Sequence, residues 1–338
     1  MKRFGILLGI MLLAVSFSLY AEESVLIDFS TLTADLEDGN NEATIVDFSG
    51  KAGVGYTDEE KQLMKTSLAI ENWDVDLASS SQTVTNEKLS YTKEAPVSEQ
   101  ASKFAGETVM GVRIHFPEEP FNSYAVIKPP FEIPGYMRKT QLQADGTLVE
   151  DETDREGSKF DSYGVVKNVG AIKSIAVDVY GSNFPNGLGI ILKDEKGEER
   201  TMFLDYMDFN GWRTLGWVNP NYISDVRNRE LHKYPLYPRT TPMRRLVGFI
   251  VYKDAAQEGG DIITYIKDAK VTYDLAVIPG TGDIDNEALW GILDSRESSR
   301  RTAEWRRLGE IQVLRALEAR KIHQDSSESA APAATTNP

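Results

Sequence analysis

The chain has 338 residues, of which 41% are hydrophobic and 26% are charged, and its formal net charge is −15. This composition is that of a folded protein long enough to bury a large core, and the negative charge argues against nucleic acid or an anionic membrane surface as a partner. The sequence contains no cysteine, which excludes thiol catalysis, cysteine-ligated zinc and lipid attachment through an N-terminal cysteine.

Residues 1–21 have the layout of a cleavable secretory signal. Lys2 and Arg3 precede an apolar run that ends at the small residue Ala21, where we expect cleavage. An uncleaved anchor stays open as the alternative, because Leu19 is large for the position three before the cut. No later stretch approaches the ~20 apolar residues of a membrane helix. The mature protein is therefore expected outside the cytoplasm.

The first part of the folded region gives mixed signals. Residues 25–29 predict a strand, and residues 57–68 predict a short helix with Thr57 as its N-cap. The alternation of residues 68–78 is typical of a half-buried strand. Residues 79–103, which are rich in Ser, Thr, Glu and Lys, are expected to form a loop region.

From residue 106 onward, strand patterns follow one another at short intervals. They are separated by Gly, Pro and acidic turn residues, with no helical patterns between them, which favours an antiparallel sandwich over a βαβ fold. We therefore predict one β-sandwich domain with long loops over residues 22–280. The predicted strands come from residues 106–116, 123–136, 164–181, 187–206, 244–253 and 261–277.

The composition changes after residue 280. Residues 281–324 predict helix, with Asp285 as N-cap, in two pieces or as one long helix that leaves the sandwich. Eight basic residues and four glutamates within 295–322 give this segment a net charge of +4. Residues 325–338 are expected to form a disordered tail. The net charge of the helical segment is thus opposite in sign to that of the whole chain.

Catalytic and metal-binding patterns are weak. His115, His232 and His323 show no metal-ligand spacing, and no P-loop, nucleophile elbow or dinucleotide fingerprint occurs. The stretch 283–287 begins like a calcium loop, but Ala288 stands where the sharp turn needs glycine, so a helix start is favoured. We predict no enzyme activity, no cofactor and no metal.

The stretch 205–222, DYMDFNGWRTLGWVNPNY, is the most aromatic part of the chain. In a regular strand, successive side chains point to opposite faces, so Trp212 and Trp217 cannot share one flat platform. We predict that Trp212 lies in the core. Trp217, Asn219 and Tyr222 are then candidates for an interface or ligand surface.

The patterns at 172–274 resemble the galactose-binding-like jelly-roll sandwich of many carbohydrate-binding modules. They include IKSIAVDVYG, GLGIILKDEKGEER, DFNGWRTLGW and YIKDAKVTYD. This resemblance implies a mainly β, antiparallel jelly-roll sandwich with a C-terminal helical extension. It says little about function.

The chain also resembles, over essentially its mature length, the flagellar filament outer layer protein of spirochaetes. The resemblance is carried by the signal, VLIDF at 25–29, NGWRTLGWVNPNYI at 210–223, the turn at 235–238 and the Arg-rich C-terminal helix. It implies a structural sheath subunit of the periplasmic flagellum that packs on flagellin-type core subunits and other sheath subunits. The family offers no catalytic residues to carry over.

Two function hypotheses remain open. In the first, Arg300, Arg301, Arg306 and Arg307 of the basic helix help a sheath subunit to meet an acidic face of a neighbour or of the filament core. In the second, the chain is a periplasmic carbohydrate-binding module that stacks a glycan on Trp217 and Tyr222 or on Trp212.

Overall fold

The computed structural model describes residues 21–34, 41–52, 55–62, 64–144, 147–154, 157–223, 242–276 and 286–329. The predicted signal peptide lies outside these residues except for Ala21, and so does the predicted tail from residue 330 onward.

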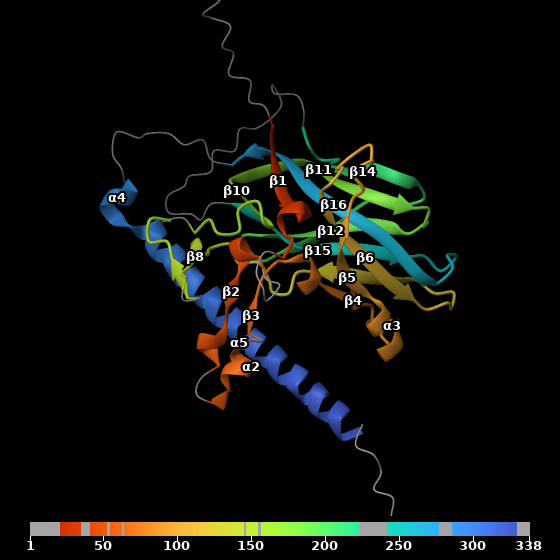
Figure 1. The fold of residues 1–338 in the computed structure, drawn as a ribbon. Helices are drawn as coiled ribbons and strands as arrows, with labels where there is room; N and C mark the ends of the chain where they lie inside the picture. Colours follow the sequence, from red (N-terminus) through yellow and green to blue (C-terminus); the bar gives the residue numbers. More distant parts are fainter. Residues whose placement is uncertain are drawn as a thin grey trace, which may run out of the picture.

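Within the described ranges, most strands form two large antiparallel sheets that pack face to face (Figure 1). The first sheet has the order β14 (Asn210–Val218), β11 (Val169–Ser182), β16 (Gly260–Leu275), β6 (Thr108–Phe116) and β5 (Tyr91–Pro96), and β1 (Glu22–Asp28) also pairs with β16. The second has the order β13 (Glu199–Tyr206), β12 (Gly187–Asp194), β15 (Met243–Lys253), β7 (Ser123–Lys128) and β4 (Asp74–Leu77), and β10 (Val165–Lys167) also pairs with β15. Small two-stranded sheets join β2 (Val46–Asp47) to β3 (Lys65–Thr66) and β8 (Thr140–Leu142) to β9 (Leu148–Glu150).

Alternation along the strands creates the core between the two sheets. Val177 and Val179 of β11 face Phe249 and Val251 of β15 across the sandwich interior, and all four side chains are fully buried. The chain changes sheet between β11 and β12, between β13 and β14, and between β15 and β16. This crossing confirms the predicted antiparallel jelly-roll sandwich.

The stretch between β1 and β5 differs from the prediction. The predicted helix 57–68 is wrong beyond α2 (Asp58–Gln62), although Thr57 does cap it, since its hydroxyl accepts a hydrogen bond from the Glu60 N–H at 3.2 Å. The chain then forms β3, because Thr66 pairs with Val46 of β2. Short 3-10 turns complete this stretch: η1 (Phe29–Thr31), η2 (Glu42–Thr44), η3 (Ser49–Lys51) and η5 (Ile70–Asn72).

The predicted strand 68–78 is confirmed only for β4, and the predicted loop 79–103 is wrong in part. It contains α3 (Val84–Leu89) and the edge strand β5. Thr83 caps α3 by accepting a hydrogen bond from the Asn86 N–H at 3.2 Å, and the buried Thr92 hydroxyl of β5 donates to the Ile70 carbonyl at 2.8 Å. These polar contacts let a hydrophilic sequence join the sandwich.

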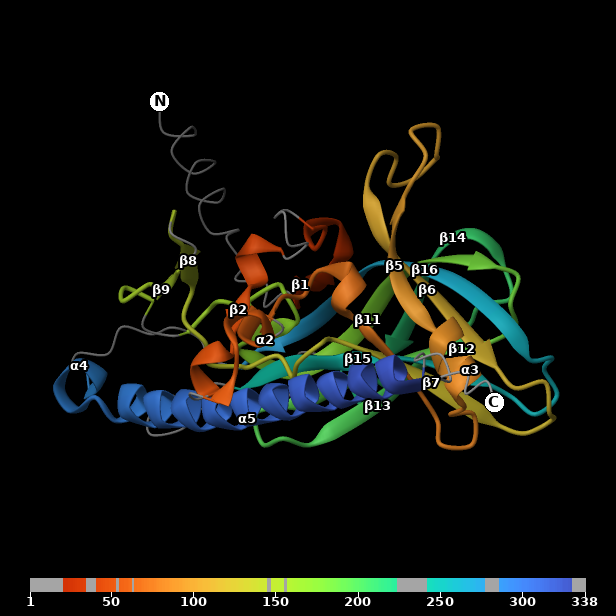
Figure 2. The same cartoon turned by 60° about the horizontal axis from the view of Figure 1, so that its bottom comes forward.

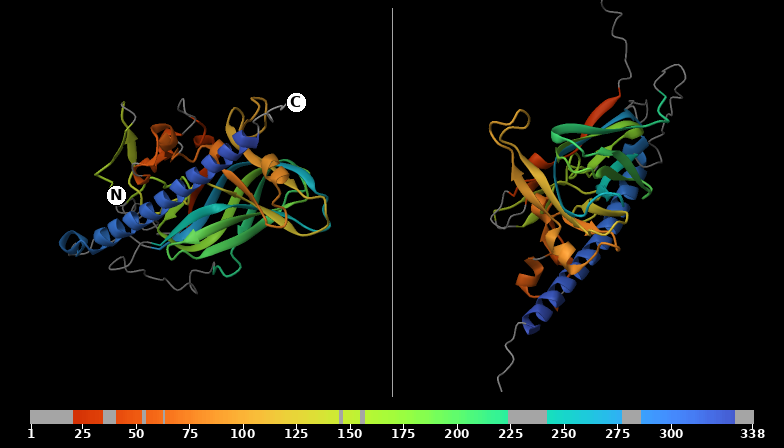
Figure 3. Two further views of the ribbon diagram at one scale, coloured as in Figure 1. Left: turned by 90° about the horizontal axis from the view of Figure 1, so that it is seen from below. Right: turned by 90° about the vertical axis from the view of Figure 1, so that its right-hand side faces the viewer.

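The C-terminal segment is helical, as predicted. α4 (Asn286–Trp290) is separated from the long α5 (Ile292–Ser329) by Gly291, whose φ of +57° ends the first helix. α5 extends past the predicted limit at 324. It does not leave the sandwich but runs along one side of it, with α4 at its far end (Figures 2 and 3).

The tryptophans of β14 lie on opposite faces, but the prediction that Trp212 belongs to the core is wrong. Trp212 is half-buried on the outer face of the first sheet, edge-to-face with Phe104 at 4.8 Å and Tyr180 at 5.5 Å between ring centroids. Leu215 and Trp217 occupy the inward face, where Leu215 is 2% exposed.

The register with β11 explains this inversion. Leu215 pairs with Val177, whose side chain is buried in the core, whereas Trp212 pairs with Tyr180 of the outer face. The alternation of side chains along a strand determines only that Trp212 and Trp217 lie on opposite faces of the sheet. The neighbouring strand decides which face is inside.

We expect Leu215→Ala to lower the free energy of unfolding by ~2–5 kcal/mol, because it opens a cavity in the core. Trp212→Ala should cost less, about 1–2 kcal/mol, because its partly solvated ring loses only edge contacts. Urea unfolding of both variants checks the order, and a larger loss in Trp212→Ala would contradict the assignment of faces.

Candidate functional site

The contact between α5 and the body of the protein has an apolar centre. Trp305 stacks on Phe48 with ring centroids 5.0 Å apart and an interplanar angle of 22°. Leu308, one turn further on, is 2% exposed and joins the main hydrophobic core. Gly309 lies so close to η3 that an added Cβ would stand 2.4 Å from Lys51 Cγ. Burial of Leu308 alone stabilises this contact by roughly 1.5–3 kcal/mol.

A cluster of charges beside this centre is organised around Glu132, in the segment after β7. Its carboxylate accepts a hydrogen bond from Arg307 at 2.6 Å and lies 3.0 Å from Lys193 Nζ of β12. Arg245 of β15, which is 7% exposed, lies 3.7 Å from Glu132 and donates to Glu304 of α5 at 3.1 Å. Opposite charges of helix and sandwich thus meet within one chain.

These contacts perturb the titration of Glu132. Burial raises its pKa, but hydrogen bonds from Arg307 and Lys193, with their positive charges, outweigh burial and hold the pKa below the usual value. The ionised form is therefore the one that the folded protein favours.

The start and the end of the contact are also polar. Arg300 Nη1 donates to the Tyr136 hydroxyl at 3.3 Å, and burial raises the pKa of Tyr136 to about 12. Toward the C-terminus, Gln312 Nε2 donates to the Pro130 carbonyl at 3.0 Å, and Arg315 donates to the same carbonyl and to Asp74 of β4.

The predicted arginines therefore separate into different roles. Arg300 and Arg307 contact their own sandwich, and Arg301 lines a small crevice with Trp305 and Tyr136. Arg306 instead points outward, with 77% of its side chain exposed, and pairs with Glu310 at 3.2 Å along the helix.

The sequence-based site omitted several residues that hold the helix. Trp305, Leu308, Gln312 and Arg315 recur every three or four positions and form the inward stripe of α5. That spacing was the available signal. The partner Arg245 had none, because only the tertiary structure brings β15 beside α5.

Trp217, Asn219 and Tyr222 each contact other parts of the chain. Asn219 Nδ2 donates to the Ile172 carbonyl at 2.8 Å, and the Tyr222 hydroxyl donates to Asp274 at 3.0 Å. Because Trp217 packs inward against the core, these residues fasten the end of β14 to its neighbouring strands.

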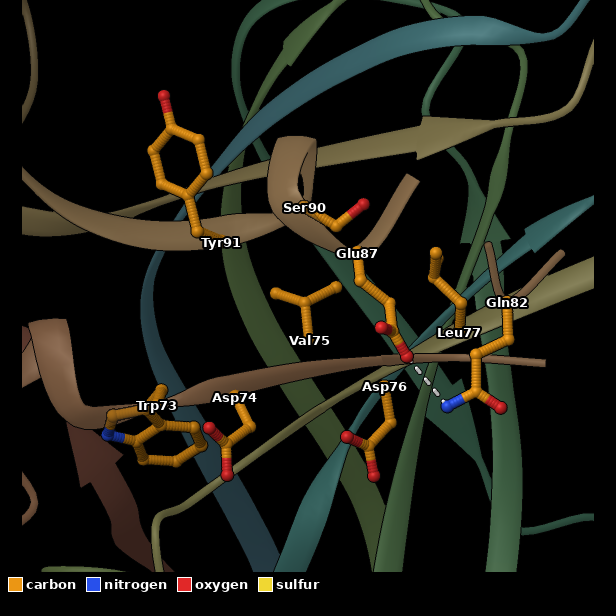
Figure 4. A pocket seen from close by; sticks show the side chains of 9 residues that line it. All are labelled: Trp73, Asp74, Val75, Asp76, Leu77, Gln82, Glu87, Ser90 and Tyr91. Atoms are coloured by element: carbon orange, nitrogen blue, oxygen red, sulfur yellow. Dashed lines mark hydrogen bonds between the residues drawn. The ribbon is translucent and has the colours of Figure 1, made fainter. Parts of the chain in front are cut away.

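An open pocket of about 280 Å³ lies between the edge strands of the two sheets (Figure 4). Acidic side chains enter it from β4 and α3, but each has a partner: Arg315 for Asp74, Lys128 for Asp76 and Gln82 for Glu87.

No group of three or more His, Asp or Glu side chains in the described ranges is arranged to hold a metal ion. Among the described helices, none combines the length and the apolarity needed to cross a membrane.

The fold and this contact define a β-sandwich protein whose C-terminal helix is clasped against its own sheets. A family model described as the flagellar filament outer layer protein matches residues 37–281. The chain is 48% identical over 335 residues to the flagellar filament outer layer protein of Spirochaeta aurantia, which covers 99% of this chain and 97% of that protein. It is 44% identical over 332 residues to the protein of the same name in Treponema pallidum (strain Nichols), with 95% of each chain covered. The chain belongs to the flagellar filament outer layer protein family, which confirms the family resemblance of its sequence.

Solved structures also match the chain, at low sequence identity and low TM-score. TmCBM61 in complex with β-1,4-galactotriose matches with a TM-score of 0.27 and 10% identity, over 60% of this chain and 88% of that one. A family 11 carbohydrate-binding module of Clostridium thermocellum matches with a TM-score of 0.24 and 12% identity, over 62% of this chain and 91% of that one. Such values identify no ligand.

The Glu132 cluster makes stability depend on pH. Because its folded pKa is depressed, Glu132 contributes stability above its unfolded pKa of about 4.3, and this contribution is lost as pH falls through the folded pKa. We expect Glu132→Gln to lower the unfolding free energy at pH 7 and to flatten its fall below about pH 4.

Urea unfolding between pH 7 and pH 3 measures this difference. Glu258→Gln, which changes an exposed glutamate between β15 and β16, is the matched control. Parallel pH profiles for the wild type and Glu132→Gln would contradict the proposed role of the carboxylate.

Proposed function

We propose that this protein is an outer layer subunit of the periplasmic flagellar filament, where it packs on flagellin-type core subunits and on neighbouring outer layer subunits. The observation that supports this proposal is the similarity to two filament outer layer proteins. It extends over 99% of the chain for the Spirochaeta aurantia protein and 95% for the Treponema pallidum protein, and so includes the helical segment. Export by a signal cleaved after Ala21 fits this destination.

The proposed role is structural and not catalytic. Where acidic and basic side chains gather in the described residues, they pair with one another. His115, for example, shares Asp261 with Arg113 at 2.8 Å and 2.7 Å. Such pairs stabilise a surface modestly.

The geometry of α5 changes the expected assembly contact. Arg300, Arg307 and Arg315 engage their own chain, so they are poor candidates for binding a neighbour. Ile311 and Leu314, 42% and 59% exposed, lie on the outward side of the helix. We assign the contact to this apolar side together with Arg306, and we assign Trp217, Asn219 and Tyr222 to support of the sandwich.

Truncation of α5 is a poor test, because it would uncover Phe48 and remove Leu308 from the core. The sharper experiment is the double variant Ile311→Ser/Leu314→Ser, in co-sedimentation with filaments stripped of their outer layer. We expect an unchanged melting temperature and roughly tenfold weaker association, as lost burial of two aliphatic side chains predicts.

Val84→Ser provides the matched control, because Val84 is a 70% exposed aliphatic residue at the start of α3. Equal co-sedimentation of the double variant and the wild type would refute the assignment to α5. Failure of the wild-type protein to associate with filaments would refute the filament role itself.

A further inference from the structure

The outer face of the second sheet carries a row of aromatic side chains. Tyr206 of β13 pairs with Gly187 of β12, Gly187 pairs with Tyr252 of β15, and Tyr252 pairs with Tyr124 of β7. Phe203 of β13 pairs with Gly189 of β12, and its ring lies 5.3 Å from Tyr206 and 6.0 Å from Tyr252. The rings thus come from three strands and meet on one surface.

Glycines of β12 form the floor between these rings. A Cβ added at Gly187 would lie 2.6 Å from the Phe203 ring, and one at Gly189 would lie 2.9 Å from Ile250 and 3.4 Å from the Tyr252 ring. The rings therefore lean over bare backbone, and side chains at these positions would push them apart. The result is a cluster of rings set edge-to-face or tilted to one another, with interplanar angles of 65° between Phe203 and Tyr206 and 50° between Phe203 and Tyr252.

The need to cover the glycines of β12 accounts for only some of the aromatic side chains in this row. Phe203, Ile250 and Tyr252 are the side chains that touch the glycine positions. Tyr206 and Tyr124 do not cover the glycine positions, yet they remain 40% and 45% exposed. Phe203 is 43% exposed. Large exposed rings in one cluster are unusual on a protein surface and mark binding sites.

Hydrogen-bonding groups border the rings. The Tyr206 hydroxyl donates to Asp254 Oδ2 at 3.1 Å. Burial and the nearby Tyr124 raise the pKa of Tyr252, so its hydroxyl keeps its proton at neutral pH. A carboxylate acceptor and phenol groups beside ring faces suit a ligand that offers both hydroxyls and C–H groups.

The surface lies away from the α5 contact. Tyr252 follows Arg245 by seven residues, which is roughly 23 Å along an extended strand. The acid at the rim, in a chain of net charge −15, disfavours an anionic ligand. Tyr206 and Tyr252 are two strands apart, roughly 10 Å, so their rings can support neighbouring units of one chain.

We propose that this surface, formed by Tyr206, Phe203, Tyr252 and Tyr124 with Asp254 at its rim, binds a linear chain of uncharged sugars. Pyranose faces present C–H groups that pack on the electron-rich faces of the rings, while sugar hydroxyls donate to the rim carboxylate. This site differs from the Trp217 and Tyr222 surface expected from the sequence, and it goes beyond the filament role.

The test uses the isolated full chain, so its failure leaves the filament role untouched. Calorimetric titration would use xylohexaose, cellohexaose and β-1,4-galactotriose as neutral probes and hexagalacturonate as the charged probe. We expect at least one neutral probe to bind at concentrations up to ~10 mM. The double variant Tyr206→Ala/Tyr124→Ala should bind it at least about tenfold more weakly, with an unchanged melting temperature.

Tyr91→Ala is the matched control, since Tyr91 is 43% exposed on the other sheet, and its variant should bind like the wild type. Absence of binding by all neutral probes would overturn the proposal, as would equal binding by the double variant or tighter binding of hexagalacturonate. Sedimentation velocity completes the test. If the double variant loses self-association while no sugar binds, the surface is a contact between protein copies and the proposal fails.

Discussion

The two large sheets bury their inner faces against each other, and this burial sets the positions of the other elements. β11 and β16 at the centre of one sheet, and β12 and β15 of the other, supply fully buried aliphatic and aromatic side chains. Because the side-chain period of a strand is two, this burial also fixes which residues face outward. The inward orientation of the Trp217 side chain and the row of aromatic side chains on the outer face of the second sheet both follow from this burial.

The C-terminal helix is basic in an acidic chain, and in the fold several of its arginines contact groups of the sandwich. Although its positive charge favours contact with an acidic partner, Arg307, Arg315 and Arg300 contact acceptors of their own sandwich. Beside the buried pair of Trp305 and Phe48, these contacts hold the helix in a defined place. The helix can then present its opposite side, with Ile311 and Leu314, at a fixed position on the surface.

The proposed packing on core subunits and on neighbouring outer layer subunits requires more than one surface. The outward side of α5 and the aromatic row of the second sheet are distinct surfaces that lie on different elements. They differ in chemistry as well, since one is aliphatic on a helix and the other is a cluster of aromatic rings with the Asp254 carboxylate at its rim. Separate contacts with separate partners are therefore compatible with one rigid sandwich.

Periodicity, composition and turn residues act locally, so they predicted the fold class, the helical C-terminus and the opposite facing of Trp212 and Trp217, and a resemblance of motifs indicated the family. The same patterns could not predict that Trp217 faces the core, that the arginines of α5 meet Glu132, Asp74 and Tyr136, or that Tyr206, Tyr252 and Tyr124 share one row. Those outcomes depend on strand register and on contacts between distant segments. A period of two cannot choose between the two faces of a strand until its neighbours are in place.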